Sequence, residues 1–315
     1  MEHSPLISII INCFNGERFL REAIDSVIAQ TYSNWELIFW DNQSTDSTAN
    51  IVRSYHDDRI RYFYAPEHTS LGEARNLALE KANGVYIGFL DSDDKWLPSL
   101  LSEYVGVIRE NPSAVLIYSN YYCCENSKMW IAYKNKCPGE INVCDLLSRY
   151  DVAISSALFK SDIVKIQNIR FNANFSLIED YDFFIRLGVC GKILYVSSPL
   201  MIYLYHQNNL SHSSKWVDEF RYLLSQINKE SLAYSELIKY RNVICKRAYY
   251  VEANYYVFSG QRRKALCIIF KYIFRYPIFI VLLLKIICGP NNLRKLHIIT
   301  LLSRLEIIGP EKARI

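Results

Sequence analysis

The chain has 315 residues, half of them hydrophobic, which is enough for one large domain with its own core and an appendage. Its nine cysteines form no CxxC pair and no zinc-type spacing, and residues 1–5 lack a basic signal-peptide start. These features exclude a disulfide-stapled secreted domain, and we expect reduced thiols in the cytosol. The net charge of +4 is uneven: residues 239–304 carry 13 Lys and Arg against Glu252 alone, a balance of +12 that leaves the rest at −8.

Strand-like and helix-like segments alternate along the first 120 residues. Continuous apolar runs predict buried strands at 6–13, 35–40, 60–64, 85–90 and 114–122. Apolar residues at helical spacing predict helices at 17–30, 44–55, 72–82 and 98–109, with Ser44 as N-cap of the second. This alternation predicts an α/β fold, a doubly wound and mostly parallel sheet.

The pattern becomes less regular after residue 141. A strand is expected over 152–160, helical spacing appears in 175–187, and strands at 193–196 and 200–205 lead to His206. From residue 215 the chain is helical in character, with helices expected at 220–232, 234–258, 262–275 and 278–288. We therefore predict an α/β domain over residues 1–214 and a C-terminal α-helical extension over residues 215–315.

The extension is both basic and apolar. Its longest uninterrupted apolar core, residues 277–284, is far below the roughly 20 residues that cross a bilayer. Amphipathic helices that lie on an anionic membrane surface through residues 239–304 fit this composition. The alternative is a helical bundle that packs on the α/β domain and exposes a solvated basic face. No nucleic-acid recognition motif accompanies the charge, so no nucleic acid is expected as a partner.

Three carboxylates end the fourth predicted strand. Asp91, Asp93 and Asp94 follow the apolar run directly. Like charges this close repel, so one carboxyl group should hold a proton or a cation should share the site. At the end of a buried strand, this arrangement suits a divalent metal that holds a diphosphate. The alternative is that Asp93 or Asp94 merely caps the helix expected near Pro98.

Two more polar residues end predicted strands. Asn15 follows the first and Asp41 follows the second. Ligands of doubly wound sheets bind beyond the carboxyl ends of the strands, so we expect these residues at one edge with the three aspartates.

Six motifs follow one another between residues 5 and 212. They are ISIIINCFNG at 7–16, DNQSTD at 41–46, GEARN at 72–76, DSD at 91–93, ED at 179–180, and YLYH at 203–206 with Ser211. In this order they resemble the large family of inverting glycosyltransferases called family 2, which includes polysaccharide and O-antigen sugar transferases and has the GT-A fold. The chain departs from the family in two places: Asn12-Cys-Phe-Asn15 stands where Pro-Thr-Tyr-Asn is usual, and Asn42 where a second Asp is common.

The resemblance implies transfer of a sugar from a nucleotide diphosphate sugar, with UDP or dTDP favoured, to an acceptor hydroxyl with inversion. The acceptor would be a glycan or a lipid-linked glycan at the inner face of the cell membrane, where the enzyme would be peripheral and cytoplasmic. Residues 1–122 would form the nucleotide-sugar half and residues 123–214 the acceptor half.

The resemblance also assigns site residues. Asp180 would be the catalytic base and Glu179 would support it, although both would also suit the first turn of a helix. The nucleotide sugar would contact Phe14, Asn15, Asp41, Arg75, Asp91 and Ser92. Mg²⁺ or Mn²⁺ would be held by Asp93, Asp91 and His206. For Arg75 the alternative is a surface salt bridge, and for His206 an ordinary place at a strand end.

Two other classes remain open. A nucleotidyltransferase would need a Gly-rich, basic phosphate loop after the first strand, whereas residues 12–18 contain only Gly16. A degenerate GT-A binding or scaffold protein could have kept the fold without the chemistry, but Asp91, Asp93 and Asp180 are all present.

Overall fold

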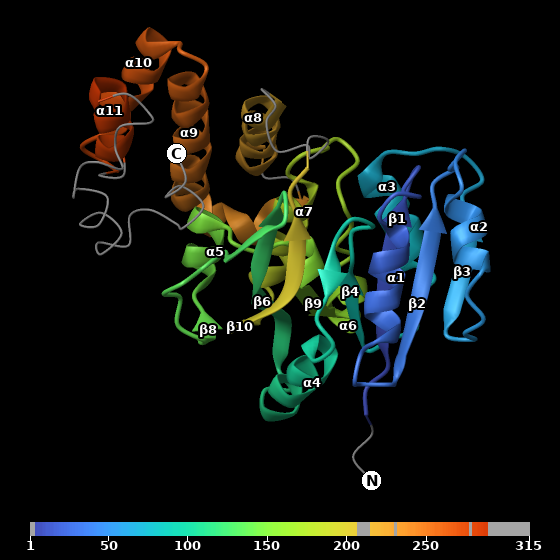
Figure 1. The fold of residues 1–315 in the computed structure, drawn as a ribbon. Coiled ribbons are helices and arrows are strands. Elements are labelled where there is room, and N and C mark those ends of the chain that lie inside the picture. The colour runs from blue at the N-terminus through green and yellow to red at the C-terminus, as the bar shows by residue number, and fades with distance from the viewer. Residues whose placement is uncertain (1–3, 207–214, 230–231, 277–278, 289–315) are drawn as a thin grey trace. The chain divides into compact units, whose positions relative to one another are not determined.

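The computed structural model describes residues 4–206, 215–229, 232–276 and 279–288 (Figure 1). The chain divides into two compact units, residues 1–143 with 152–209 and residues 144–151 with 210–315. The boundary expected at residue 214 lies outside the described residues. Each unit is described by itself below.

The first unit is built on one ten-stranded sheet with the order β3-β2-β1-β4-β9-β6-β10-β5, to which β7 adds beside β6 and β8 beside β10. Its strands are β1 Ile7–Cys13, β2 Trp35–Asp41, β3 Ile60–Tyr64, β4 Tyr86–Phe89, β5 Lys95–Trp96, β6 Ala114–Glu125, β7 Lys128–Ile131, β8 Gly139–Ile141, β9 Ala157–Lys160 and β10 Lys192–Leu204. Its helices are α1 Leu20–Ile28, α2 Thr48–Arg53, α3 Leu71–Leu79, α4 Leu100–Glu110, α6 Ser161–Ile166 and α7 Glu179–Gly188, with a 3-10 turn η1 at Ile154–Ser156.

The sheet is mostly parallel. β1 pairs in parallel with β2 and β4, and β2 with β3, at the blue edge of Figure 1. β9 runs antiparallel between β4 and β6, and β6 and β10 are again parallel. Every residue of β2 is buried, as the continuous apolar run predicts for a strand covered on both faces. The predicted α/β fold with a doubly wound, mostly parallel sheet is confirmed.

Two local predictions are wrong. Ser44 does not cap α2, which begins at Thr48 after Ser47; the hydroxyl of Ser44 instead accepts the N–H of Asn15 at 3.0 Å. The strands expected at 193–196 and 200–205 form the single strand β10. Its register with β6 shifts on both sides of Pro199, which has no N–H to donate, and this irregularity explains the apparent break.

The second unit is helical. It contains α5 Val143–Arg149, α8 Lys215–Asn228, η2 Leu232–Tyr240, α9 Arg241–Phe258, α10 Arg262–Tyr272 and α11 Phe279–Cys288. The segment expected as one helix over 234–258 is a 3-10 helix followed by α9. Helices α9, α10 and α11 pack on one another around a small apolar core (Figure 1). No helix within the described ranges has the length and apolar character to span a bilayer.

A buried carboxylate, Glu36, joins four segments at the amino-terminal ends of the first strands. Its Oε1 accepts the hydroxyl of Ser8 and the N–H of Asn83, and its Oε2 accepts Nη1 of Arg61, each at 2.7 Å. The N–H of Gly84 donates to the same Ser8 hydroxyl at 2.7 Å, and a Cβ at Gly84 would lie 2.5 Å from Ser8 N. Burial acts to raise the pKa of Glu36, but these hydrogen bonds outweigh it and lower the pKa below 4.5.

Replacing Glu36 with Gln should destabilise the first unit by about 3 kcal/mol, because several donors lose a charged acceptor in a buried place. Since the folded pKa is depressed, the contribution of Glu36 is full above the unfolded value of 4.5 and is lost as pH falls through the lower folded pKa. Urea unfolding at neutral and acid pH should therefore show a difference in the free energy of unfolding between wild type and variant, and this difference should become smaller as the pH is lowered. Glu22→Gln is the control, because Glu22 is half exposed and forms a surface ion pair with Lys95. An equal loss of stability in both variants would contradict the prediction.

Candidate active site

Three neighbouring strands deliver polar residues to one edge of the sheet. Asn15 follows β1, Asp41 ends β2, and Asp91 comes two residues after β4. β1 lies between β2 and β4 in parallel register, so these three ends are adjacent. The structure thus brings together the polar strand ends singled out in the sequence.

The acidic cluster consists of Asp91, Asp93 and Asp94, whose carboxylate oxygens lie within 4.8 Å of one another. Burial raises the pKa of Asp91, and the nearby Asp93 adds to the rise while Arg75 opposes it. Burial, then Asp93 and Asp91, raise the pKa of Asp94 well above its usual value. A set of hard oxygen ligands that needs positive charge to coexist fits Mg²⁺ or Mn²⁺. Helix α4 begins at Leu100 after Ser99, so the alternative that Asp93 or Asp94 caps it is wrong.

Asp94 is a structural member of the cluster. Its Oδ2 accepts the hydroxyl of Ser155 at 2.6 Å and its Oδ1 accepts the N–H of Leu204 at 3.1 Å. The same Ser155 hydroxyl accepts the N–H of Asp91 at 3.1 Å, and the Ser155 carbonyl accepts Nε1 of Trp96 at 2.6 Å. Ser155, at 0% exposure, therefore ties the loop after β4 to η1 and to the end of β10.

Arg75 connects the acidic cluster to the acidic pair at the start of α7. Its Nη1 donates to Oε1 of Glu179 at 2.8 Å and its Nη2 to Oδ1 of Asp91 at 3.1 Å. Burial acts against its charge, but Asp91, Glu179 and Asp180 outweigh burial and raise the pKa of Arg75. Arg75 is 3% exposed, so the alternative of a surface salt bridge is wrong. It braces the carboxylates from inside the protein.

The acidic pair opens helix α7. Glu179 is buried and Asp180 half-buried, both in the first turn, where the helix dipole favours negative charge. The N–H of Tyr181 donates to Oδ1 of Asp180 at 2.6 Å. Oε2 of Glu179 has no hydrogen-bond partner among the described residues, so one buried acceptor remains for a bound group. Glu179 and Asp180 therefore do lie in the first turn of a helix, and this position is compatible with the catalytic role expected for them.

His206 reaches the acidic cluster from the end of β10. Its Nε2 lies 2.7 Å from Oδ2 of Asp93, and its ring stacks on Phe19 with 5.4 Å between centroids. The structure thus places His206 next to a predicted metal ligand.

A pocket of about 290 Å³ opens at the carboxyl ends of β1 and β2. It is lined by Asn12, Cys13, Phe14, Asn42, His68, Thr69, Ser70, Leu71 and Ala74. The rings of Phe14 and His68 lie 4.4 Å apart, and Nδ1 of His68 lies 2.8 Å from the carbonyl oxygen of Asn42. Burial raises the pKa of the Cys13 thiol to about 12, so it remains neutral at physiological pH and is no nucleophile.

Two predicted nucleotide-site residues hold the surrounding loops. Asp41 is fully buried and accepts the N–H of Ser44 and the hydroxyl of Tyr62, both at 2.7 Å. Asn15 has a positive φ of 55° and accepts the N–H of Thr45 at 2.8 Å. Neither side chain lines the pocket.

Ser92 lies against the loop after β1. A Cβ added to Gly16 would come 3.3 Å from the Ser92 hydroxyl and 2.3 Å from the Cys13 sulfur, so only glycine fits this contact. The loops after β1 and β4 are thereby in direct contact at the site.

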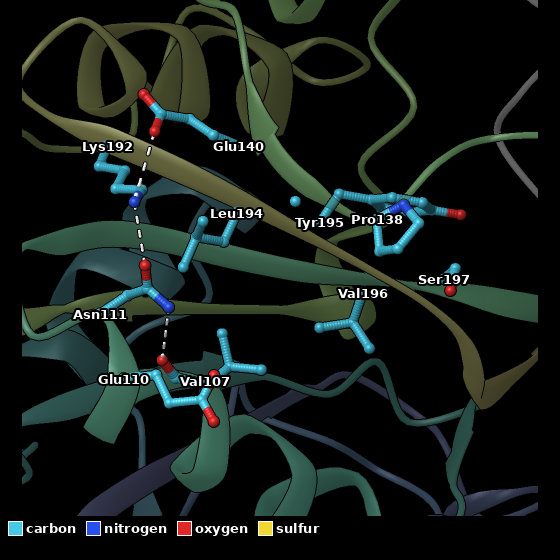
Figure 2. A pocket seen from close by; sticks show the side chains of 11 residues that line it. Val107, Glu110, Asn111, Pro138, Glu140, Lys192, Leu194, Tyr195, Val196 and Ser197 are labelled. Carbon is cyan, nitrogen blue, oxygen red and sulfur yellow. Dashed lines mark hydrogen bonds and ion pairs between the residues drawn. The ribbon is translucent and has the colours of Figure 1, made fainter.

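A second hollow, of about 410 Å³, lies between α4, β8 and β10 (Figure 2). There Nζ of Lys192 contacts Oδ1 of Asn111 at 2.9 Å and a carboxylate oxygen of Glu140 at 3.3 Å. Lys192 is the first residue of β10, whereas the N–H of Leu204, at the other end of this strand, donates to Asp94. The larger hollow is therefore remote from the carboxylates, and we place the active site at the smaller pocket and the acidic cluster.

Sequence reasoning missed His68, Thr69 and Ser155. His68 and Thr69 lie between β3 and α3, at the same sheet edge as Asn15 and Asp41, and that position was the one available signal. Nothing local marks Ser155, because its partner Asp94 is 61 residues away in the sequence.

The α/β fold and the acidic cluster fit a glycosyltransferase, and comparisons with known proteins agree. The family model described as Glycosyl transferase family 2 matches residues 8–165. The chain is 30% identical to the UDP-Glc:alpha-D-GlcNAc-diphosphoundecaprenol beta-1,3-glucosyltransferase WfaP of Escherichia coli, over 71% of this chain and 84% of that protein. It is 29% identical to the Escherichia coli enzyme WfgD, which has the same enzyme name, over 69% of this chain and 83% of that protein.

A solved structure supports the fold. S. aureus TarS 1–349 in complex with UDP-GlcNAc matches with a TM-score of 0.62 and 18% identity, over 73% of this chain and 71% of that chain. The chain therefore belongs to glycosyltransferase family 2. The predicted family and its GT-A-type α/β fold are both confirmed, and the nucleotidyltransferase alternative is wrong.

Ser155→Ala should weaken Mn²⁺ binding at the acidic cluster by about tenfold or more, because the hydroxyl orients Asp94 and the Asp91 backbone together. Calorimetric titration of the folded protein with Mn²⁺ measures this directly. The matched control is Ser156→Ala, since Ser156 is equally buried but its hydroxyl bonds only the local carbonyl of Ala153. Equal effects of the two variants would show that η1 matters only for packing.

Proposed function

We propose that this protein transfers a sugar from a UDP- or dTDP-linked donor to a hydroxyl of a lipid-linked glycan, with inversion at the anomeric carbon. The single observation that carries the proposal is the bridge from Arg75 to both Asp91 and Glu179, which sets a diphosphate-type acidic cluster beside a candidate base. WfaP and WfgD are named as glucosyltransferases that act from UDP-Glc on a diphosphoundecaprenol-linked GlcNAc, which supports a UDP sugar and a lipid-linked acceptor.

The nucleotide is proposed to enter the pocket between Phe14 and His68. Their tilted rings, 4.4 Å apart, offer an aromatic surface to a planar base. Asp41 and Asn15 would act by holding the loops that form the wall, and Ser92 would lie nearest the diphosphate. Oδ1 and Nδ2 of Asn12 line this region without hydrogen-bond partners among the described residues, and a bound base could satisfy them.

The divalent cation would be Mg²⁺ or Mn²⁺, held by Asp93, Asp91 and His206. When bound, it would supply the Lewis acidity that a leaving diphosphate requires. Asp94, whose two oxygens already accept protein donors, would orient the loop rather than the cation. Arg75 would keep Asp91 ionised and in place.

Asp180 is proposed as the base. One displacement inverts the anomeric carbon: the acceptor oxygen bonds to it, the acceptor proton passes to Asp180, and the bond to the diphosphate oxygen breaks to release the nucleotide. Glu179, held by Arg75, would fix the start of α7 and so the position of Asp180.

The helical extension is proposed to hold the enzyme at the membrane. Residues 239–304 carry the +12 balance, and anionic lipid is a partner of matching charge. Residues 289–304 lie outside the described residues. A lipid-linked acceptor would place the enzyme peripherally at the inner face of the cell membrane.

Asp180→Asn should lower transfer by about 10²–10⁴-fold while nucleotide binding stays near wild type, because the amide cannot take the acceptor proton. The assay uses UDP-glucose, dTDP-glucose and a short-chain GlcNAc-diphosphate lipid. Asp162→Asn is the matched control: Asp162 also lies in the first turn of a helix, but it is half exposed and pairs with Lys160. Near-normal turnover of Asp180→Asn would remove the assignment.

Calorimetry with UDP, dTDP and GDP, each with and without Mn²⁺, should show metal-dependent binding of one nucleotide. That binding should be lost in Asp93→Ala, since this change removes a carboxylate that faces His206 in the cluster. Failure of the folded wild type to bind any of the three would favour the non-catalytic binding or scaffold alternative.

A further inference from the structure

Helix α10 has two apolar sides, and only one of them is used in packing. Ala265 and Ile269 are fully buried in the core that α10 forms with α9 and α11. Cys267, Phe270 and Phe274 are exposed, Phe270 by 60% and Phe274 by 98%.

The three exposed residues form one stripe. They are spaced by three and four positions, which places side chains on one face of a helix. Ile273, between Phe270 and Phe274, keeps helical angles of −58° and −41°, so the stripe continues past the last residue of α10, Tyr272. Two phenyl rings are therefore exposed on the same side of this helical segment.

Cations surround this stripe. Residues 262–276 contain five basic residues and no acidic one, and all five are exposed: Arg262, Arg263, Lys264, Lys271 and Arg275. An apolar stripe flanked by cations has the composition of a helix that lies in the interface of an anionic bilayer, with its rings below the headgroups and its cations among the phosphates.

We propose that the outward face of α10, made of Cys267, Phe270 and Phe274 with the five flanking cations, is the part of the chain that enters an anionic lipid surface. This inference rests on the membrane association proposed above and assigns it to specific side chains. Charge complementarity selects anionic lipid as the occupant, and two exposed rings on one face, flanked by cations, suit insertion among acyl chains.

Sedimentation of the full-length protein with vesicles tests the assignment. Wild type should bind vesicles of phosphatidylglycerol and phosphatidylcholine and bind pure phosphatidylcholine weakly. The double variant Phe270→Ser, Phe274→Ser should bind the anionic vesicles at least about tenfold more weakly, because the inserted rings are gone. It should keep wild-type nucleotide binding and thermal unfolding, since both rings are already in solvent.

The matched control is Leu232→Ser. Leu232 is 91% exposed in the same unit but stands alone near the Glu236–Lys239 ion pair. If the double variant binds like wild type, the face is wrongly assigned while membrane association stands. If wild type binds no anionic vesicle, both membrane proposals are overturned, and nucleotide binding still tests the transferase proposal separately.

A second measurement reads insertion directly. An environment-sensitive fluorophore on the exposed thiol of Cys267, in a Cys137→Ser background, should shift to the blue with anionic vesicles and be quenched by lipid-borne quenchers. The same fluorophore on exposed Cys137 of the first unit, in a Cys267→Ser background, should show neither effect. Equal shifts at both positions would overturn the assignment to α10.

Discussion

The buried guanidinium of Arg75 is the interaction on which the rest of the site depends. It pairs with Asp91 after β4 and with Glu179 at the start of α7, although Glu179 is 104 residues further along the chain. A buried charge is costly unless it is paired, and here each carboxylate compensates the cation while the cation relieves their mutual repulsion. The donor side and the acceptor side of the proposed reaction are therefore joined electrostatically. Replacing Arg75 would leave Asp91 and Glu179 without the cation that they share, whereas replacing Glu179 would remove one of the two partners of a buried guanidinium.

The negative charge of Asp91, Asp93 and Asp94 is only partly balanced by the positive charge of Arg75. Burial and like charges raise the pKa of Asp91 and Asp94, and two positions on other segments, Ser155 and the N–H of Leu204, hold Asp94 in place. The protein thus keeps three carboxylates together at a cost, and that cost is a reason to expect a cation there rather than a simple loop. The sheet makes it possible, because β4, β9 and β10 bring the three segments to a common edge.

The sequence predicts the parts of this fold that are coded locally. Continuous apolar runs identify β1 and β2 because both faces of these strands are covered, and polar strand ends locate the site because parallel strands end at one edge. The errors have long-range causes. Ser44 resembles an N-cap, but its hydroxyl accepts the N–H of Asn15 in the loop after β1. The sequence of β10 resembles two strands because its register with β6 shifts on both sides of Pro199. His68 and Ser155 carry no motif, since their roles exist only once distant segments meet.

The uneven charge of the chain fits the membrane association proposed above. The chain outside residues 239–304 has a net charge of −8 and would be repelled by an anionic bilayer. A lipid-linked acceptor would nevertheless lie at that surface. The +12 of residues 239–304 would reverse the repulsion, but an electrostatic attraction falls off within a Debye length and is weakened by salt. Exposed rings such as Phe270 and Phe274 add a contribution that salt does not screen. A basic, aromatic helical unit is therefore the complement that an acidic transferase needs when its acceptor stays in the membrane.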